Sequence, residues 1–397
     1  MNILFVGQYY PDQLLNELKK YSKGGLDFAA HNLHKALFKG FEDNKVQIDI
    51  LNYPHLGSFP PYYRKPFVPS CCDVSNHLNS ISYVNISFFK RYDIKRKIYS
   101  NIEEWCCHKD GRKIIILYNF ECVELAAKIK STYENVKVCL IVTDLKEYMI
   151  PRQTVLTRIN TFATNLFTPE NTKWYDSIDS YILLAEKMKE RLPIGNKPWI
   201  LMEGIYNSEY IAEDIPKESN KTIMYTGNLG KRYGIIELID AFEQIESNEY
   251  RLWIRGNGDS LEYVKKIGNR DPRIKIFDVL SRHELVRLQK RATILINPVS
   301  PKEDFTSYFF PSKTLEYLAS GTPTLMFRLN CLPKEYYKHL YFIEEDTVGG
   351  IKDALVNVCS QPQEKLNAFG EKAISFILEN KCPKVQVRRL IDFFKTL

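Results

Sequence analysis

The sequence predicts an α/β protein of two Rossmann-like domains built on parallel sheets. Short apolar runs alternate with amphipathic helical patterns from end to end, which is typical of parallel α/β layers. A length of 397 residues exceeds what one ordinary hydrophobic core holds, so two domains are expected. An irregular, proline-bearing stretch at 193–216 separates two such series and predicts a linker between them.

The first half contains five predicted strands and an early amphipathic helix. The helix is expected at Leu26–Phe38, directly after a turn containing Gly24 and Gly25. The expected strands are short, apolar and rich in β-branched residues. They are Asn2–Gly7, Val46–Asn52, Lys113–Tyr118, Val136–Val142 and Ser180–Leu184.

The second half repeats this alternation with more regular spacing. The expected strands are Thr222–Gly227, Arg251–Gly256, Ile274–Phe277, Ile294–Asn297 and Thr324–Phe327. The expected helices are Ile235–Ile245, Leu261–Ile267, Arg282–Arg291 and Ser312–Ser320. The tail Val385–Leu397 has apolar residues at helical spacing, which predicts a helix that docks by one face. We therefore expect an N-terminal domain of residues 1–200, joined by the helix at 384–397, and a C-terminal domain of residues 201–383.

Composition narrows the class of function. The net charge of +7 suits an anionic small substrate or an anionic membrane surface, whereas a nucleic-acid binder usually carries a denser basic footprint. Nine cysteines without a C-x-x-C pair predict no zinc site and fit a reducing cytoplasm. The sequence contains no run of 18 apolar residues, so no membrane-spanning helix is expected. The start of the chain predicts a strand rather than a signal peptide. A G-x-S-x-G nucleophile motif is missing, which weighs against a hydrolase.

The most informative segment is Phe309–Pro323, FFPSKTLEYLASGTP. Its proline can open a helix, and its glycine can end one in the left-handed conformation. Free N–H groups near Ser312 and Lys313 then form an anion site beside the Lys313 ammonium. Glu316 lies one turn deeper, where a carboxylate can accept hydrogen bonds from two neighbouring hydroxyls. Hydrogen-bond donors suited to a phosphate, followed by a carboxylate suited to the two hydroxyls of a ribose, predict a nucleotide site.

A second segment at Ile223–Phe242, IMYTGNLGKRYGIIELIDAF, has the pattern of a strand followed by a glycine-containing turn and then a helix. Gly227 and Gly230 permit close approach of backbone, and Lys231 and Arg232 can meet a diphosphate from the loop. The alternative is an ordinary strand-to-helix connection whose glycines serve only the turn. Both interpretations remain open from this segment alone.

In order along the chain, four segments resemble the C-terminal domain of a GT-B glycosyltransferase. They are TGNLGKRYG, WIRGNGD, IKIFDVLSRHELVRLQKRATILINP and FFPSKTLEYLASGTPTLM. More narrowly, they are similar to glycosyltransferase family 4 (glycosyl transferases group 1) of the bacterial surface-polysaccharide type. The resemblance covers Thr222 to about Phe327 and extends only weakly to the first half. It implies the GT-B fold, with two Rossmann-like domains whose parallel sheets face across a cleft that holds the active site.

The resemblance also assigns roles to individual residues. It implies that Glu316 binds the ribose hydroxyls of a sugar nucleotide. The family's first motif glutamate would stand eight positions earlier, where this chain has Tyr308, which leaves Tyr308 as the candidate sugar contact. The family's basic residues of the glycine loop would fall on Asn228 and Tyr233, and neither side chain can neutralise a phosphate.

Other residues of the second half complete the implied donor site. Lys231, Arg232 and Lys313 are the cations available in place of the family's own. The family holds its base against backbone near the segment Phe277–Ser281, which makes Val279–Ser281 the candidate nucleobase loop. With the glycine turn of the first half included, the implied donor-binding residues are Gly25, Gly227, Asn228, Lys231, Arg232, Ser281, Ser312, Lys313 and Glu316.

The first half supplies the candidate catalytic residue. The turn at Gly24 and Gly25 matches the family's glycine turn near the donor phosphates, and a flexible loop before a helix is the alternative. Thr143 stands where relatives place a catalytic histidine, which leaves Asp144 as the side chain able to act. The alternative for Asp144 is a helix cap. No metal ligand set is expected.

The resemblance implies a retaining hexosyltransferase of EC 2.4 type that uses a UDP- or GDP-linked sugar without a cofactor or metal. Its acceptor would be a glycan or a lipid-linked oligosaccharide in bacterial capsular, exopolysaccharide or O-antigen synthesis. The alternative is a non-catalytic GT-B subunit that binds a sugar nucleotide or a partner glycosyltransferase, favoured by Tyr308 and by the missing loop cations. A sugar-nucleotide epimerase on the same fold would need carboxylates that the sequence does not place.

The segment Phe88–Tyr99, FFKRYDIKRKIY, interleaves five basic residues with aromatic and aliphatic ones. Helices that lie on anionic lipid have this composition, so it predicts a peripheral contact with an anionic membrane at residues 88–99. The alternative is a solvated helix face whose apolar side meets the core. The loop Pro60–Phe67 has a similar character and is a candidate contact for a lipid-linked acceptor. We expect a cytoplasmic protein at the inner face of the membrane and no nucleic-acid partner.

Overall fold

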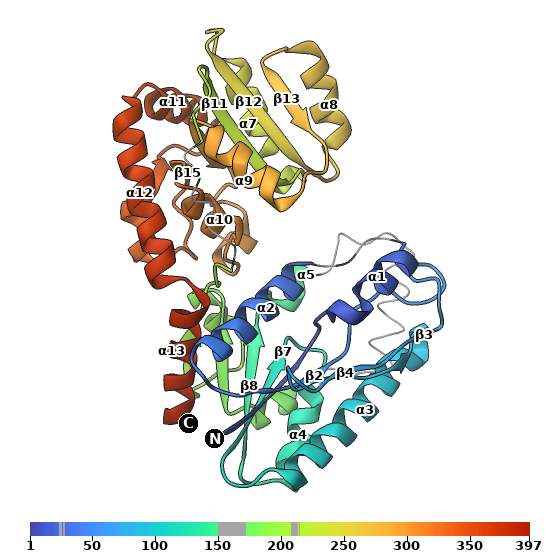
Figure 1. The fold of residues 1–397 in the computed structure, drawn as a ribbon. Helices are drawn as coiled ribbons and strands as arrows, with labels where there is room; N and C mark the ends of the chain where they lie inside the picture. Colours follow the sequence, from blue (N-terminus) through green and yellow to red (C-terminus); the bar gives the residue numbers. More distant parts are fainter. Residues whose placement is uncertain (24–25, 27, 150–171, 208–212, 214) are drawn as a thin grey trace. The chain divides into compact units, whose positions relative to one another are not determined.

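The chain folds into two compact units in a computed structural model that describes residues 1–23, 26, 28–149, 172–207, 213 and 215–397. The N-terminal unit comprises Met1–Asn207 and Pro383–Leu397, and the C-terminal unit comprises Ser208–Cys382. The chain therefore returns to the N-terminal unit for its last helix. Figure 1 shows the two units as separate α/β bodies.

The N-terminal unit is built on an eight-stranded sheet in the order β10-β9-β8-β7-β1-β2-β5-β4. All neighbours pair in parallel except β4 and β5, which are antiparallel. The strands are β1 (Asn2–Gly7), β2 (Asp49–Asn52), β4 (Cys71–Asp73), β5 (Leu78–Ser80), β7 (Lys113–Tyr118), β8 (Val136–Val142), β9 (Ser180–Leu183) and β10 (Trp199–Leu201). A separate two-stranded ribbon pairs β3 (Phe67–Val68) with β6 (Tyr83–Val84). Because the chain builds outward from β1 first through β2 and later through β7, the strand order reverses between β1 and β7.

Helices cover this sheet through apolar stripes. They are α1 (Asp12–Tyr21), α2 (Phe28–Asp43), α3 (Ser87–His108), α4 (Val123–Thr132), α5 (Lys146–Met149) and α13 (Pro383–Thr396), with 3₁₀ turns at Thr172–Ser177 and Glu186–Glu190. Figure 1 shows α13 beside α2. Gly40 of α2 allows this approach, because a Cβ there would lie 2.3 Å from a methyl carbon of Val387. Val387, Leu390 and Phe394 of α13 thereby join the sheet core.

The C-terminal unit has a six-stranded sheet in the order β13-β12-β11-β14-β15-β16, and every neighbouring pair is parallel. The strands are β11 (Lys221–Asn228), β12 (Tyr250–Asn257), β13 (Ile274–Phe277), β14 (Ile294–Asn297), β15 (Thr324–Phe327) and β16 (Tyr341–Ile343). The helices are α7 (Ile235–Glu243), α8 (Leu261–Arg270), α9 (Arg282–Arg291), α10 (Lys313–Ser320), α11 (Val348–Cys359) and α12 (Gln363–Asn380), with 3₁₀ turns η3 (Lys231–Tyr233), η4 (Asp304–Ser307) and η5 (Lys334–His339). The order reverses between β11 and β14, which is where ligands bind in open α/β sheets.

The predicted fold class is confirmed, because both units carry mostly or wholly parallel sheets with covering helices. Some predicted bounds differ from the structure. The strand expected from Val46 begins at Asp49, and the helix expected to end at Phe38 continues to Asp43. The continuation of α2 depends on packing against α13, a contact from the other end of the chain that local spacing does not reveal.

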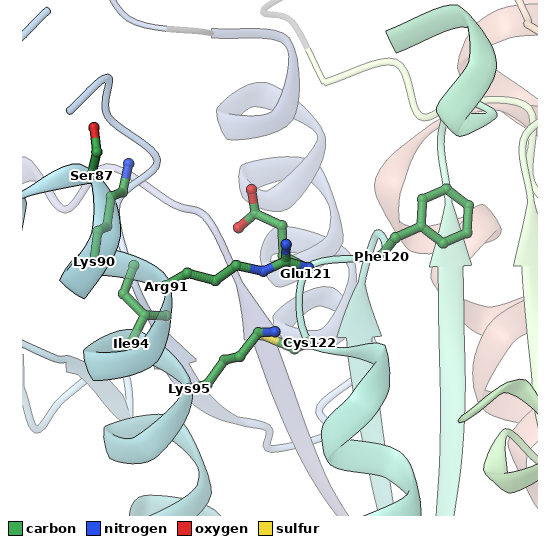
Figure 2. Close-up of a pocket in the computed structure, with 8 residues that line it drawn as sticks. All are labelled: Ser87, Lys90, Arg91, Ile94, Lys95, Phe120, Glu121 and Cys122. Carbon is green, nitrogen blue, oxygen red and sulfur yellow. The ribbon is translucent and has the colours of Figure 1, made fainter. Parts of the chain in front are cut away.

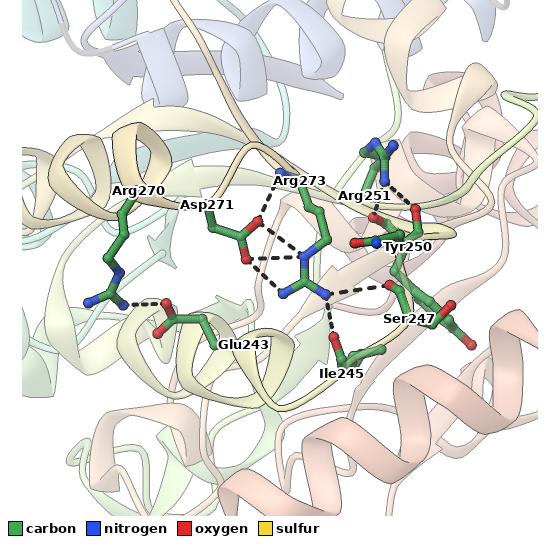
Figure 3. Close-up of polar contacts among 9 residues, drawn as sticks. Glu243, Ile245, Ser247, Tyr250, Arg251, Arg270, Asp271 and Arg273 are labelled. Carbon is green, nitrogen blue, oxygen red and sulfur yellow. Dashed lines mark hydrogen bonds and ion pairs between the residues drawn. The ribbon is translucent and has the colours of Figure 1, made fainter.

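A cluster of arginines lies at the amino ends of β12 and β13 in the C-terminal unit (Figure 3). The Arg273 guanidinium meets the Asp271 carboxylate in a forked arrangement, with Nη2 2.7 Å from Oδ2 and Nε 3.1 Å from Oδ1. Arg273 also donates to the carbonyls of Ile245 and Ser247. This pairing holds the pKa of Asp271 below its usual range. The cluster lies at the edge opposite the carboxyl ends of the strands, so its role is stability.

Replacing Arg273 by methionine should lower the free energy of unfolding by about 1.5–3 kcal/mol, because hydrogen bonds to a largely buried carboxylate are lost. Arg270→Met is the matched control, since Arg270 is 66% exposed and its pairing with Glu243 lies at the surface. That control should cost about 1 kcal/mol or less. Urea denaturation measures both, and equal losses in the two variants would contradict the account.

Candidate functional site

The glycine turn after β11 lies at the reversal point of the C-terminal sheet. Gly227 has a φ of 143°, a conformation that L side chains rarely adopt. On the neighbouring strand, a Cβ on Gly256 would lie 1.9 Å from the Gly227 carbonyl oxygen. The two turns therefore pack backbone against backbone, which leaves N–H groups and carbonyls rather than side chains at this edge.

The Lys313 ammonium lies next to this turn, at the start of α10. A Cβ on Gly227 would lie 3.3 Å from Lys313 Nζ, and the ammonium sits 4.3 Å from the centroid of the Tyr225 ring. Within the described part of the chain, no hydrogen bond or ion pair engages this ammonium. Burial disfavours its charged form and lowers the pKa of Lys313 to about 7. An anion bound here would gain a cation that currently has no counter-charge.

Backbone donors accompany the ammonium at the start of α10. The first N–H groups with acceptors are those of Thr314 and Leu315, which donate to Pro311 and Ser312. The N–H groups of Ser312 and Lys313 have no acceptor among the described residues. The Ser312 side chain is exposed and does not cap the helix. Free N–H groups at a helix start attract anions, so the geometry matches a phosphate site.

Glu316 lies one turn further along α10, with 41% of its side chain exposed. Its Oε1 accepts a hydrogen bond of 3.0 Å from Arg282 Nη2, at the start of α9. Burial raises the pKa of Glu316, and the positive charges of Arg282 and Arg255 act against that rise. Because Arg282 binds only one of the two carboxylate oxygens, the carboxylate keeps acceptor capacity for further hydroxyls.

A buried tyrosine fixes α10 against β11. The Tyr317 hydroxyl donates to the Thr226 carbonyl at 3.0 Å and accepts from the Thr226 N–H at 2.8 Å. The Thr226 hydroxyl lies 3.0 Å from the same oxygen. Thr226 precedes the glycine turn, so these bonds set the distance between that turn and the side chains of Lys313 and Glu316.

The remaining predicted loop residues lie around the same turn with other partners. Asn228 Oδ1 accepts from the Gly230 N–H at 2.8 Å and so shapes the turn itself. Lys231 has an exposed side chain, and its N–H donates to Asp259 at 3.2 Å. The Arg232 guanidinium stacks 4.7 Å from the Phe305 ring centroid. Of the two predicted loop cations, only Lys231 therefore extends into solvent without an aromatic partner in the described part of the chain.

Of the remaining predicted residues, Ser281 has a structural role at the start of a helix. Ser281 caps α9: its hydroxyl accepts from the Glu284 N–H at 3.3 Å, while Glu284 accepts from the Ser281 N–H at 2.8 Å. Val279 is 90% exposed in the loop predicted to face a base. Tyr308 ends η4 and is buried. Gly25 lies outside the described residues.

In the N-terminal unit, Asp144 lies just after the carboxyl end of β8. The Thr143 N–H and hydroxyl both donate to Asn119 Oδ1, at 3.1 Å and 2.9 Å, and Asn119 follows the neighbouring strand β7. This contact ties the ends of β7 and β8 together and places Asp144 at the ligand-binding edge of its sheet. Sequence patterns did not identify Arg282 or Tyr317, because their partners lie far along the chain.

Residues 207–376 match the family model described as glycosyl transferases group 1. Residues 207–376 form a glycosyl transferases group 1 domain. Among curated proteins, the sequence comparison found no match.

Solved structures extend the likeness to both units. Sucrose-phosphate synthase from Thermosynechococcus elongatus is 12% identical, with a TM-score of 0.63 over 100% of this chain and 99% of that chain. An α,α-trehalose-phosphate synthase (UDP-forming) from Burkholderia vietnamiensis is 10% identical, with a TM-score of 0.58 over 100% of both chains. A trehalose-6-phosphate structure from E. coli bound with UDP-2-fluoro glucose is 10% identical, with a TM-score of 0.64 over 100% of this chain and 99% of that chain. At this identity the likeness concerns the fold, which is GT-B.

The lowered pKa of Lys313 predicts a pH-dependent affinity for nucleoside diphosphates. The ammonium that binds the anion is present below about pH 7 and is lost above it, so UDP affinity should fall by several-fold from about pH 7 to about pH 8.5. Isothermal titration calorimetry measures the affinities. Lys313→Arg is the matched control, because a guanidinium keeps its charge, and its affinity should not change over this range. A wild type whose UDP affinity is flat with pH would reject a role for this ammonium.

Proposed function

We propose that this protein is a retaining glycosyltransferase that moves a hexosyl group from a nucleotide sugar to a glycan or lipid-linked acceptor. The observation that carries the proposal is the position of Lys313 and Glu316 one turn apart on α10, inside the glycosyl transferases group 1 domain. Lys313 and the helix start suit a diphosphate, and Glu316 suits the ribose hydroxyls one turn away. The bound UDP-2-fluoro glucose of the E. coli structure favours UDP as the donor nucleotide.

The chemistry requires positive charge at the departing diphosphate. In the transfer, the acceptor hydroxyl oxygen bonds to the sugar's anomeric carbon while the bond from that carbon to the diphosphate breaks. The hydroxyl proton passes to an oxygen of the departing nucleoside diphosphate, which leaves with the electron pair of the broken bond. Lys313 and the free N–H groups of α10 would stabilise that charge, and Lys231 would reach it from the neighbouring loop. Among the described residues, no three potential metal-ligating side chains gather in one place. Asp144 is the proposed catalytic side chain on the acceptor side.

Glu316→Gln should lower kcat/KM for the donor by about 10- to 100-fold, since a charge-assisted hydrogen bond to a hydroxyl contributes about 1.5–3 kcal/mol. Nucleoside diphosphate release with UDP-glucose and lipid-linked oligosaccharide acceptors measures the effect. Glu262→Gln is the control, because Glu262 is an exposed carboxylate of the same unit. If both variants turn over like wild type, Glu316 does not bind the donor.

The alternative proposal is a non-catalytic subunit that binds a sugar nucleotide. It is favoured by Tyr308, a buried side chain at the position of the family's first motif acid. The same assay separates the two. A wild-type protein that binds UDP-glucose but releases no UDP with any acceptor would favour the subunit.

The proposal includes a peripheral contact between the start of α3 and an anionic membrane, consistent with a role in bacterial surface-polysaccharide synthesis. No helix in the described residues is long and apolar enough to cross a bilayer. Three aromatic side chains of the first turns are exposed: Phe88 by 79%, Phe89 by 63% and Tyr92 by 69%. The exposed Phe67 and Tyr62 belong to the neighbouring loop, which joins this region through pairing of β3 with β6. The middle turns of α3 instead bury Ile94, Ile98 and Ile102.

Replacing Phe88, Phe89 and Tyr92 together by serine should weaken binding to vesicles of anionic phospholipid by at least about tenfold, because each aromatic ring loses its burial in the interface. Sedimentation with sucrose-loaded vesicles measures this, and binding by wild type should fall as salt rises. Val74→Ser is the control, since Val74 is an exposed apolar residue in the turn between β4 and β5. Unchanged vesicle binding by the triple variant would reject the membrane contact.

A further inference from the structure

Arg255 lies near the carboxyl end of β12, directly before the glycine that packs against the Gly227 carbonyl. In the parallel sheet it pairs in register with Thr226 of β11 on one side and with Phe277 of β13 on the other. Thr226 is the residue that the Tyr317 hydroxyl holds, so Arg255 lies one strand, about 4.8 Å, from the point at which α10 is fixed. Arg255 therefore belongs to the edge of the sheet that carries the candidate donor site.

The side chain of Arg255 leaves the sheet on the face that α9 and α10 cover. Trp253, two residues earlier on β12, packs in a cluster with Tyr317 of α10 and with apolar side chains of α9. Side chains two residues apart on a strand lie on the same face, so the Arg255 side chain also extends toward these helices. Burial raises the pKa of Glu316, and the charges of Arg282 and Arg255 oppose that rise, which places the Arg255 guanidinium near the Glu316 carboxylate.

The Arg255 guanidinium is partly buried, yet within the described part of the chain no hydrogen bond, ion pair or ring contact engages it. The ion pair of Glu316 is made by Arg282 instead, with Nη2 3.0 Å from Oε1. A guanidinium stays charged and presents five N–H donors in a fixed planar fork. The donors of Arg255 are therefore available for acceptor atoms of a ligand.

Lysines at the corresponding edge of the N-terminal sheet have partners within the protein. There a pocket of about 330 Å³ lies between the start of α3 and the loop after β7, and Lys90, Lys95 and Glu121 are among the residues that line it (Figure 2). The Lys90 ammonium donates to the Leu56 carbonyl, and Lys95 pairs with Glu124. These contacts satisfy both lysines, whereas the donors of Arg255 have no partner among the described residues.

The order of the strands at the C-terminal edge follows the order of the groups in a nucleotide. Lys313 lies against the glycine turn of β11, which suits the diphosphate, and Glu316 follows on α10 for the ribose. Arg255 is one strand further out on β12, and the exposed loop Val279–Ser281 follows β13 beyond it. Neighbouring strands are about 4.8 Å apart, so a base attached to that ribose would lie within reach of Arg255 and of this loop.

We propose that Arg255 selects the nucleobase of the donor by donating hydrogen bonds to a carbonyl oxygen of the base. The inference rests on the proposed transferase function and names the class of nucleotide that the donor site takes. A guanidinium only donates, so it suits the carbonyl oxygens of uracil and the O6 and N7 acceptors of guanine. Adenine carries an amino group where guanine carries O6, and its N–H donors would face those of Arg255. The site should therefore favour UDP or GDP over ADP.

Isothermal titration calorimetry of the full chain with UDP, GDP, ADP and inorganic pyrophosphate tests this assignment. Wild type should bind UDP or GDP at least about tenfold more tightly than ADP, the discrimination typical of a well-placed Arg–base contact. Arg255→Met should lose about that factor for the preferred nucleotide and keep its affinities for ADP and pyrophosphate within about twofold of wild type. Retained ADP binding also shows that the variant is folded. The nucleotide that loses the larger factor identifies the base as uracil or guanine.

Arg255→Gln should narrow the gap between ADP and the preferred nucleotide, because a carboxamide can pair with N6 and N7 of adenine. Arg251→Met is the matched control. Arg251 lies at the amino end of the same strand and donates to the carbonyls of Asn248 and Tyr250 (Figure 3). Its loss should leave all four affinities unchanged.

Equal weakening of all four ligands by Arg255→Met would overturn the inference, because it would place Arg255 at the phosphates that the four ligands share. Affinities that Arg255→Met leaves unchanged would also overturn it, as would a wild type that binds ADP as tightly as UDP and GDP. A wild type that binds none of the three nucleotides would instead contradict the proposed transferase itself, so the two failures are distinguishable.

Discussion

The hydroxyl of Tyr317 is the contact on which the donor-side geometry depends. It lies in the core of the C-terminal unit and binds the N–H, the carbonyl and the hydroxyl of Thr226. A buried hydroxyl that satisfies both backbone groups of one residue fixes the helix and the strand in register, because breaking it would leave buried polar groups unpaired. Lys313 is one turn before Tyr317, and Gly227 directly follows Thr226. The contact between Tyr317 and Thr226 therefore brings the Lys313 ammonium close to the glycine turn.

The sheets of the two units share one feature of their topology. Each sheet reverses its strand order once next to its first strand, between β1 and β7 or between β11 and β14. In the C-terminal unit the reversal point carries a glycine turn and the Lys313 ammonium, which has no counter-charge among the described residues. In the N-terminal unit it carries the Glu121 carboxylate, which is hydrogen-bonded to Gln8. The first edge therefore suits an anion.

The elements that the sequence predicted are those with clear local signals, whereas the helices α1, α4, α11 and α12 were not predicted. The predicted bounds of the helix Arg282–Arg291 match those of α9, and the structure adds a capping box formed by Ser281 and Glu284 at its start. The short strands β3, β6, β10 and β16 were not predicted, because each is too short for a periodic pattern. Their pairing partners decide their conformation, and those partners lie elsewhere in the chain.

For the candidate site, the sequence predicted the residues that the spacing along a single helix brings together. Lys313 and Glu316 are three residues apart, so a helix places them on one face, and the structure has them on α10. The contact of Arg282 with Glu316, the stacking of Arg232 on Phe305 and the pocket beside Glu121 depend on tertiary packing. Glu121 had one available signal, since it is the first acid after a buried strand, where ligand-binding side chains gather.

The central claim is that α10 and the turn after β11 hold the diphosphate and ribose of a sugar nucleotide. Hydrogen–deuterium exchange of the full chain with and without UDP tests it most directly, because ligand binding slows the exchange of the amides it covers. The account predicts slower exchange at residues 226–231 and 312–317, with the amino ends of β12 and β13 unchanged. Exchange that UDP leaves unaltered in both segments, or slows only in the N-terminal unit, would contradict it.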